Sequence, residues 1–279
     1  MDAINAGFRK VGIGATAELS LRVSVATLTK VLFKHPEDGR TMLALERTAT
    51  LREIEGKQAV IVKAKPFGGG VRIKDLETFQ TFIGEFQFDS QRSREEMDFR
   101  IQIRPQNWEK VKVFCLRQFQ EEIGILESRP ERELREEFED ALKIKITPDD
   151  YHLTSVRAVV EEEPMKTDNV RAPDTSTVRI YNVFEVRMIA SRLVDAILKN
   201  SASFSDADLR TLAWEDVRSG GKGRANGVLA LPLDLLTNAY MAVPFNERDG
   251  PICFEGYQLD GNVLAVLEEV ATPKYIRGR

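Results

Sequence analysis

The residues whose types and spacing could do chemistry are concentrated in one stretch, residues 128–142. Four carboxylates recur there at spacings of three and four residues: Glu133, Glu136, Glu137 and Asp140. On a helix this spacing places them along one side over about two turns. Leu134, Phe138, Ala141 and Leu142 recur at a similar spacing, which predicts a separate apolar stripe facing the core.

This acidic stripe is open to two interpretations. Like charges at helical spacing repel one another, so a row of carboxylates suits a seat for a hard cation. Mixed Arg and Glu are also typical of a solvated helix face, and Arg132 and Arg135 interleave with the acids. Ser128 as a cap and Pro130 in the first turn predict where the helix starts.

Composition leaves carboxylates as the candidate reactive groups. The 279-residue chain has two histidines, His35 and His152, which argues against a zinc cluster and against a histidine-based triad. Cys115 and Cys253 lie far apart among apolar neighbours, and we expect both to be reduced and buried. No long apolar run and no apolar signal core occur, so we expect a cytoplasmic protein without a membrane segment.

The overall charge bears on the possible partners. A net charge of −4 gives no general attraction to nucleic acid or to an anionic membrane. An anionic substrate therefore needs a local device, either a bound cation or a cluster of arginines. The sequence leaves the oligomeric state open, a homo-oligomer included.

Hydrophobic periodicity predicts an alternation of strands and helices around a mixed sheet. The predicted strands are residues 21–33, 41–47, 59–65, 99–103, 154–160 and 177–189. The predicted helices before residue 190 are 74–83, 108–123 and the acidic helix. Beyond it we expect an extension of helices and loops, with helices at 193–198, 206–212, 233–241 and 262–270.

Two glycine-rich segments invite a functional interpretation. Gly68, Gly69 and Gly70 follow a predicted strand directly, which fits either a flexible loop or a close approach of the backbone to another group. Residues 219–227 also contain four glycines, but they lack the Walker spacing and no strand feeds them. We expect this second segment to be a mobile surface loop.

Residues 132–137, Arg-Glu-Leu-Arg-Glu-Glu, resemble the second half of the Nudix box of the Nudix hydrolase family. The resemblance covers about residues 21–189. The chain departs from the pattern where Gly124 replaces its upstream glutamate and Glu139-Asp140 replaces its closing Gly-aliphatic pair. The resemblance implies a Nudix-like α/β/α sandwich with a mixed β-sheet over residues 1–190, a large insertion at about 75–127, and a mostly helical extension, 191–279, packed on the same core.

The same resemblance implies roles for individual residues. Glu133, Glu136 and Glu137 would hold Mg²⁺, or Mn²⁺ in its place, with Glu133 and Glu137 as the catalytic acids. Arg132 would orient a neighbouring glutamate. Gly69, Gly70 and Arg157 would contact substrate, and a further acid would come from a strand end, at Glu161, Glu162 or Glu163.

Two functions follow as hypotheses. The first is a Mg²⁺-dependent hydrolase that cleaves the pyrophosphate bond of a nucleoside diphosphate linked to another group. The second is a catalytically impaired Nudix-like domain that binds a nucleotide derivative or a protein partner in a regulatory or assembly role. Base recognition would fall to residues 71–88 or 245–257; Trp108 and Trp214 could stack on a base, although core packing is the expected role of both.

Overall fold

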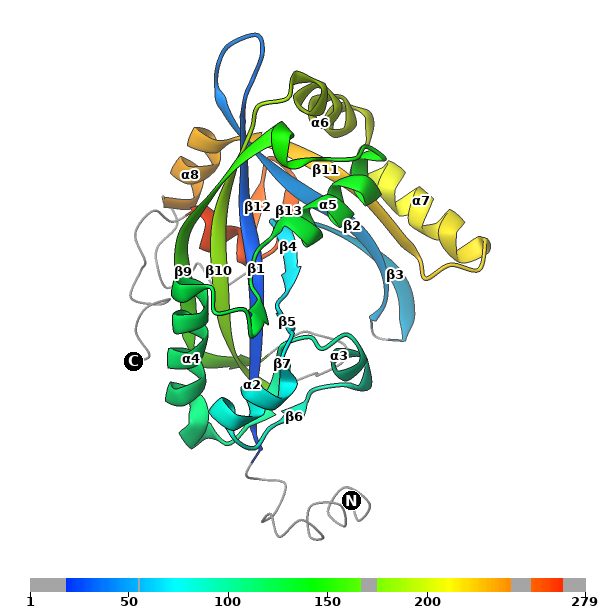
Figure 1. Ribbon diagram of the computed structural model, residues 1–279. Coiled ribbons are helices and arrows are strands. Elements are labelled where there is room, and N and C mark those ends of the chain that lie inside the picture. The colour runs from blue at the N-terminus through cyan, green and yellow to red at the C-terminus, as the bar shows by residue number, and fades with distance from the viewer. Residues whose placement is uncertain (1–18, 55, 167–174, 242–251, 268–279) are drawn as a thin grey trace.

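The structure is a computed structural model that describes residues 19–54, 56–166, 175–241 and 252–267. It is an α/β protein with a mixed sheet, as the sequence predicts (Figure 1). The main sheet runs in the order β12-β13-β3-β2-β1-β10-β9. Its central strands are β1 (Leu21–Lys34), β2 (Thr41–Ile54), β3 (Lys57–Lys65), β9 (Tyr151–Lys166) and β10 (Ser176–Met188).

The long strand β1 organises the molecule. It pairs in parallel with β10 along one edge, while three strands follow one another antiparallel along its other edge. These three are β7 (Arg100–Ile103), β4 (Phe67–Gly70) and β2. The glycine strand β4 therefore lies between the insertion and the β1–β2 hairpin.

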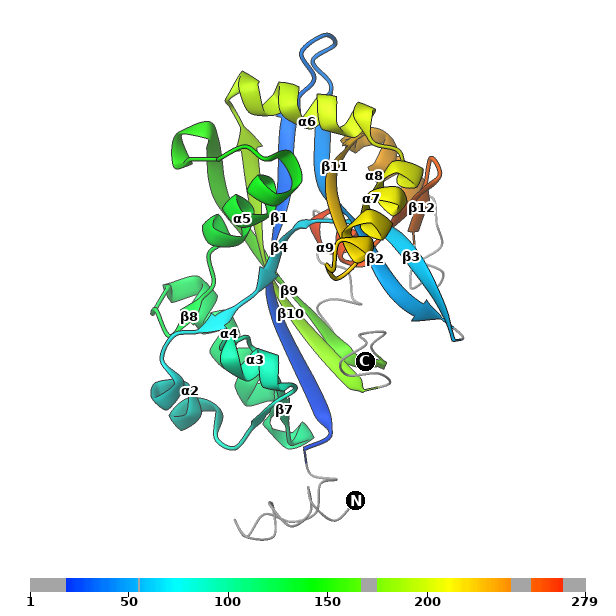
Figure 2. The ribbon, with the colours of Figure 1, turned by 90° about the vertical axis from the view of Figure 1, so that its right-hand side faces the viewer.

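Helices cover both faces of this sheet, as the two side views show (Figures 1 and 2). On one face, α5 (Glu131–Leu142) and α6 (Ser191–Ser203) share a core with Val31 and Phe33 of β1. On the other face, α8 (Leu233–Met241) and α9 (Asn262–Leu267) pack against the neighbouring positions Leu28 and Leu32. Alternate side chains of a strand point to opposite faces, so one strand serves both cores.

The insertion forms a separate lobe around the N-terminal half of β1. It comprises β5 (Arg72–Ile73), α2 (Leu76–Ile83), β6 (Gln87–Phe88), α3 (Gln91–Glu95), β7, α4 (Trp108–Glu121) and β8 (Leu126–Glu127). The ring centroid of Phe79 in α2 lies within 5.6 Å of the ring centroids of Phe86, Phe99 and Phe114. Phe79 therefore lies at the centre of the lobe's core. Trp108 packs at the edge of this core.

The region after residue 190 contains strands as well as helices, so the expectation of helices and loops alone was wrong. Besides α6, α7 (Asp206–Arg218), α8 and α9 it holds β11 (Arg224–Pro232), β12 (Ile252–Phe254) and β13 (Tyr257–Leu259). β11 pairs antiparallel with β2 over nine residues. Buried Arg47 of β2 fastens this region by donating to Asp206 and to the carbonyl of Phe204.

Residues 219–227 are partly strand and not the predicted loop throughout. Residues 224–227 belong to β11, and the turn before them is closed by Asp216. Its carboxylate accepts hydrogen bonds from the amides of Gly223 and Arg224, at 2.8 and 3.2 Å. The carboxylate of Asp216 thus accepts from the two amides that a bound phosphate would need as hydrogen-bond donors.

Two further expectations need correction. Ser128 does not cap α5, because Pro130 holds the N-cap position; the Ser128 carbonyl instead accepts from Thr27 and Asn182, which docks this segment on the sheet. Cys253 is exposed, whereas Cys115 is buried as predicted. Cys253 alternates with buried Phe254 in a short strand and so points outward.

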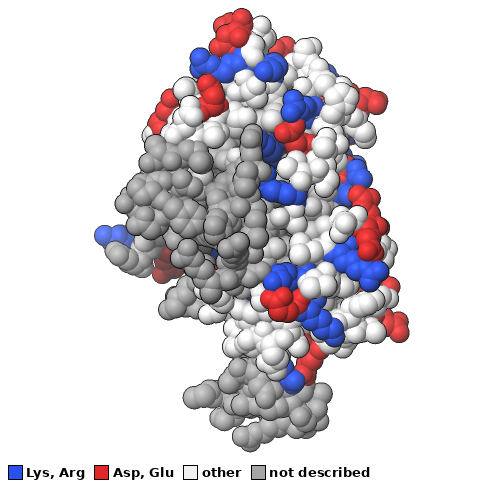
Figure 3. Space-filling model, turned by 90° about the vertical axis from the view of Figure 1, so that its left-hand side faces the viewer, with Lys and Arg blue, Asp and Glu red and all other residues white. Residues whose placement is uncertain are grey.

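None of the helices in the described ranges is long and apolar enough to cross a membrane. On the face shown in Figure 3, the described Lys and Arg side chains lie interspersed with Asp and Glu. A single-sign patch that would draw in a polyanion is not visible among those residues.

Candidate functional site

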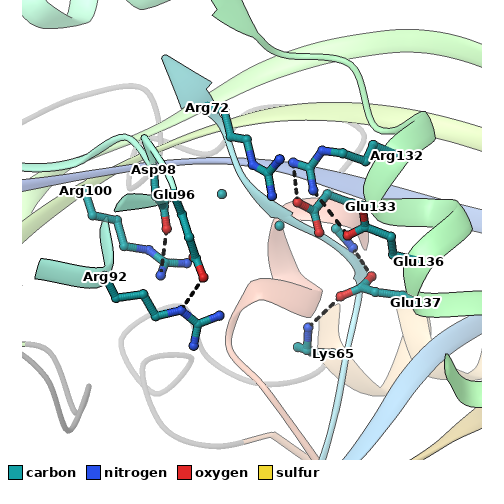
Figure 4. Close-up of a pocket in the computed structure, with 13 residues that line it drawn as sticks. Lys65, Arg72, Arg92, Glu96, Asp98, Arg100, Arg132, Glu133, Glu136 and Glu137 are labelled. Atoms are coloured by element: carbon teal, nitrogen blue, oxygen red, sulfur yellow. Dashed lines mark hydrogen bonds and ion pairs between the residues drawn. The ribbon is translucent and has the colours of Figure 1, made fainter. Parts of the chain in front are cut away.

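A polar cavity of about 310 Å³ lies along β4, between α5 and the insertion (Figure 4). It is lined by Lys65, Gly68, Gly69, Gly70, Arg72, Arg92, Glu96, Asp98, Arg100, Arg132, Glu133, Glu136 and Glu137. Two walls can be distinguished. The α5 wall consists of the side chains at 132, 133, 136 and 137, and the insertion wall of those at 72, 92, 96, 98 and 100.

The apolar stripe of helix α5 determines which way the acidic side chains of its wall point. Leu134 and Phe138 are buried, as the spacing predicts, and the ring of Phe138 stacks on Phe67 of β4 with centroids 4.5 Å apart. Glu133 and Glu137 precede these two residues by one position each, and they turn toward β4, where they lie against Gly69 and Gly68 respectively. Glu136 is half exposed, with 54% of its side chain accessible.

The glycines of β4 are required by the close approach of carboxylates, which resolves the two interpretations of this segment. A Cβ built on Gly69 would lie 2.4 Å from the carboxylate of Glu133. A Cβ on Gly70 would lie 2.3 Å from Oδ1 of Asp98. Gly68 has φ +140°, and a Cβ there would meet the backbone of Thr27. The segment is thus a strand flanked by two acids, one from each wall.

Glu137 is held by contacts within the chain. Its carboxylate accepts from the amide of Gly68 at 2.6 Å and from Nζ of Lys65 at 3.1 Å. Lys65 also lies 2.5 Å from Oε2 of Glu46, a fully buried residue paired with it across β2 and β3. One ammonium group therefore bridges two carboxyl groups at the base of the cavity.

These contacts shift the pKa values of Glu137, Glu46 and Lys65. Burial raises the pKa of Glu137 to about 8, against the opposing effect of Lys65. Burial acts in the same sense on Glu46, but contact with Lys65 outweighs it and lowers the pKa of that carboxyl. Burial alone would lower the pKa of Lys65, whereas Glu46 and Glu137 raise it. Of the two carboxyl groups, Glu137 is therefore the one that holds a proton more readily.

Arg132 holds the remaining acids of the α5 wall. Its guanidinium lies 2.6 Å from Glu133, 3.0 Å from Glu127 and 3.3 Å from Glu136. Burial would lower the pKa of Arg132, but the acids around it, first Glu133, raise it. Arg132 thus contacts Glu133 and Glu136 within the lining of the cavity, and the orienting role that the resemblance implies for it stays a prediction.

The insertion wall is fixed by a buried ion pair. Nη2 of Arg22 on β1 lies 2.7 Å from Asp89, and both side chains are almost fully buried. Asp89 also accepts from Ser93 of α3, which places Arg92 at the cavity. These contacts hold α3 and the segment that follows it against the sheet.

Asp98 carries a polar atom without a partner. Its Oδ2 pairs with Arg100 at 2.9 Å, but its buried Oδ1 accepts no hydrogen bond from any described residue. Burial raises the pKa of Asp98 despite Arg100. An unsatisfied buried oxygen at a cavity calls for an explanation, and a ligand donor would supply one.

The donor chemistry of the α5 wall fits a hard cation, because Mg²⁺ prefers carboxylate oxygens. In the part of the chain that the structure describes, however, no three acidic side chains converge closely enough to hold an ion. Lys65 and Arg132 account for this, since they hold the acids in ion pairs. A cation could bind at Glu133, Glu136 and Glu137 only if these acids released their internal partners.

The structure brings together six of the seven site residues expected from the sequence: Gly69, Gly70, Arg132, Glu133, Glu136 and Glu137. Arg157 is not among the lining residues, and its guanidinium donates to the carbonyl of Ala265. Glu161 pairs with Arg179, and Glu163 is exposed on β9 outside the cavity. The side chain of Glu162 and residues 245–251 lie outside the described residues.

Sequence reasoning missed Lys65, Glu46 and the insertion wall, apart from Arg72, which lies in the segment 71–88 named for ligand recognition. Lys65 ends a predicted strand just before the glycines, and that position was an available signal. Asp98 and Arg100 carry no signal, because only the pairing of distant strands brings them to β4. Trp214 packs against the core under α7, and Trp108 packs against the core of the insertion. Both positions agree with the expected role in core packing.

Comparison with known proteins leaves the site to be interpreted from its geometry. A scan against protein-family models finds no matching family, and searches of the curated proteins and of the solved structures find no match either.

Proposed function

We propose that the cavity binds a nucleoside diphosphate linked to another group and hydrolyses its pyrophosphate bond with the help of Mg²⁺. The observation that carries the proposal is the arrangement of the two walls. Carboxylates of α5 face arginines of the insertion across a strand of glycines, within one polar cavity. This is the local device that an anionic substrate requires in a chain of net charge −4.

In this proposal Glu133, Glu136 and Glu137 hold the cation, which supplies neutralisation of phosphate charge and activation of a water. Glu137 is the group that must lose a proton, and Lys65 is the partner that must release it. Arg132 keeps Glu133 and Glu136 in position in the absence of the cation and must likewise release them to it. The mixed sheet with helices on both faces is, in the same proposal, a Nudix-like sandwich.

The test is a panel of nucleoside diphosphate derivatives incubated with the full chain and Mg²⁺. We expect cleavage of at least one, and a fall of at least about 100-fold in kcat for Glu137→Gln, the range of a lost acid–base or metal-binding group. Glu139→Gln is the matched control, since Glu139 is exposed on the same helix outside the cavity. Equal rates for wild type and Glu137→Gln would rule out the assigned site.

A binding function is the second candidate, and one observation favours it. Both oxygens of Glu137 already have partners, Lys65 and the Gly68 amide, so the wall is stable without a cation. A Nudix-like domain of this kind would bind a nucleotide derivative without turnover. Thermal stabilisation by such a ligand, with no cleavage at any Mg²⁺ concentration, would favour this second function.

A further inference from the structure

Among the residues that the structure describes, one cation that lines the cavity has no acidic partner. Five cationic and five acidic side chains line it. Lys65 pairs with Glu137, Arg132 with Glu133 and Glu136, Arg100 with Asp98, and Arg92 with Glu96. Arg72 makes no ion pair or side-chain hydrogen bond with any residue that the structure describes.

The backbone of Arg72 is held on both sides. Arg72 pairs with Glu127 in the two-stranded sheet of β5 and β8, and it forms a bridge with Asp98 on its other side. The adjacent amide of Ile73 donates to the carbonyl of Met97 at 2.8 Å. The position from which the side chain extends is therefore fixed by backbone pairing and not by an ion pair.

The side chain of Arg72 extends into the space between the two walls. In Figure 4 its guanidinium lies between Glu133 on one side and Asp98 on the other. Asp98 contributes the oxygen that lacks a hydrogen-bond donor. A guanidinium and a carboxylate oxygen that both lack a partner in the described part of the chain thus occur at the same part of the cavity.

We propose that Arg72 is the anion-binding residue of this cavity and takes a phosphoryl group of a ligand that contains a diphosphate. The planar guanidinium matches two oxygens of a phosphoryl group and is always charged. The cations of the α5 wall, Lys65 and Arg132, are taken up by its acids and offer phosphate no free charge, so the ligand's attachment in the absence of a bound cation falls to Arg72. The inference rests on the proposed function, because it takes this cavity as the ligand site. It adds that Arg72 is the residue that holds the ligand.

Inorganic pyrophosphate is the probe, titrated calorimetrically into the full chain with and without Mg²⁺. We expect wild type to bind it and Arg72→Gln to bind roughly 10- to 100-fold more weakly, the range of a lost charge-assisted contact. Arg72→Lys should fall between the two, because it keeps the charge but loses the fork. Arg117→Gln removes an exposed arginine of the insertion outside the cavity and should bind as wild type does.

Thermal unfolding of each variant shows whether it is folded; Arg72→Gln should be, since no ion pair with a described residue is lost. Equal affinity of Arg72→Gln and wild type, or no binding by wild type in either condition, would overturn the inference. Arg72-dependent binding without cleavage of any diphosphate derivative would support the inference and count against the hydrolase. Cleavage of a diphosphate derivative with kcat and KM unchanged in Arg72→Gln would support the hydrolase and count against the inference.

Discussion

The two walls of the cavity differ in how their charges are held. On the α5 wall the acids stand on one helix, stacked on Phe67, and two internal cations, Lys65 and Arg132, hold them. On the insertion wall the charges come from β5, α3, the segment before β7, and β7 itself, and one buried ion pair secures α3 to the sheet. The acids of the α5 wall are therefore positioned by one helix, although its partners Phe67 and Lys65 are distant in sequence, whereas the insertion wall depends on contacts between several short segments.

The largest expected effect tests how much the insertion wall depends on the buried ion pair of Arg22 and Asp89. Asp89→Ala leaves the guanidinium of Arg22 buried without its partner, and we expect a loss of about 3–5 kcal/mol in the free energy of unfolding. Denaturant unfolding measures this loss. Glu121→Ala breaks the exposed pair with Arg117 in the same lobe and should cost less than about 0.5 kcal/mol. Similar losses for the two variants would contradict the role given to the buried pair.

The next effect belongs to the α5 wall and depends on pH. The pKa of Glu137 is raised from 4.5 to about 8, so the folded protein binds this proton more tightly than the unfolded chain does. The stability that the proton confers is therefore complete below about pH 4.5 and is lost as the pH rises toward 8, with a slope of up to about 1.4 kcal/mol per pH unit. Unfolding measured from pH 5 to 8 should show a flatter profile for Glu137→Gln; an equally steep one would contradict this prediction.

The smallest expected effects separate the walls at adjacent glycines. Gly69→Ala places a methyl group on the Glu133 carboxylate, and Gly70→Ala places one on Asp98. We expect Gly69→Ala to lower kcat and Gly70→Ala to raise KM, each by roughly tenfold, as for displaced supporting groups. Steady-state kinetics on a cleaved substrate measures the split. The same change in kcat and KM for both variants would show that the walls do not act separately.

Helical periodicity explains why the α5 wall could be predicted from the sequence. The spacing of Leu134 and Phe138 fixes which side of the helix is buried, and it thereby fixes where Glu133 and Glu137 point. The stacking partner Phe67 is some seventy residues away, and no local pattern identifies it. The same holds for Lys65, which reaches Glu137 only through the register of β3 on β2.

The insertion wall and the strand β11 could not be predicted, for different physical reasons. Arg72 falls in the segment 71–88 that was expected to recognise a ligand, but only the folded cavity shows that it has no acidic partner among the described residues. β11 contains Gly227, where an added Cβ would lie 3.2 Å from Oδ1 of Asn200 and 3.6 Å from Leu209. A glycine packed inside a strand has the same sequence signature as a glycine in a loop.

The most direct test of the cation site is a crystal of the full chain grown with Mn²⁺, examined by anomalous scattering. The account predicts a peak in the cavity beside β4, at about 2.1 Å from carboxylate oxygens of Glu133, Glu136 and Glu137, with Lys65 and Arg132 moved away from them. A cavity without a peak at saturating Mn²⁺, in which Lys65 still bridges Glu46 and Glu137, would contradict the account.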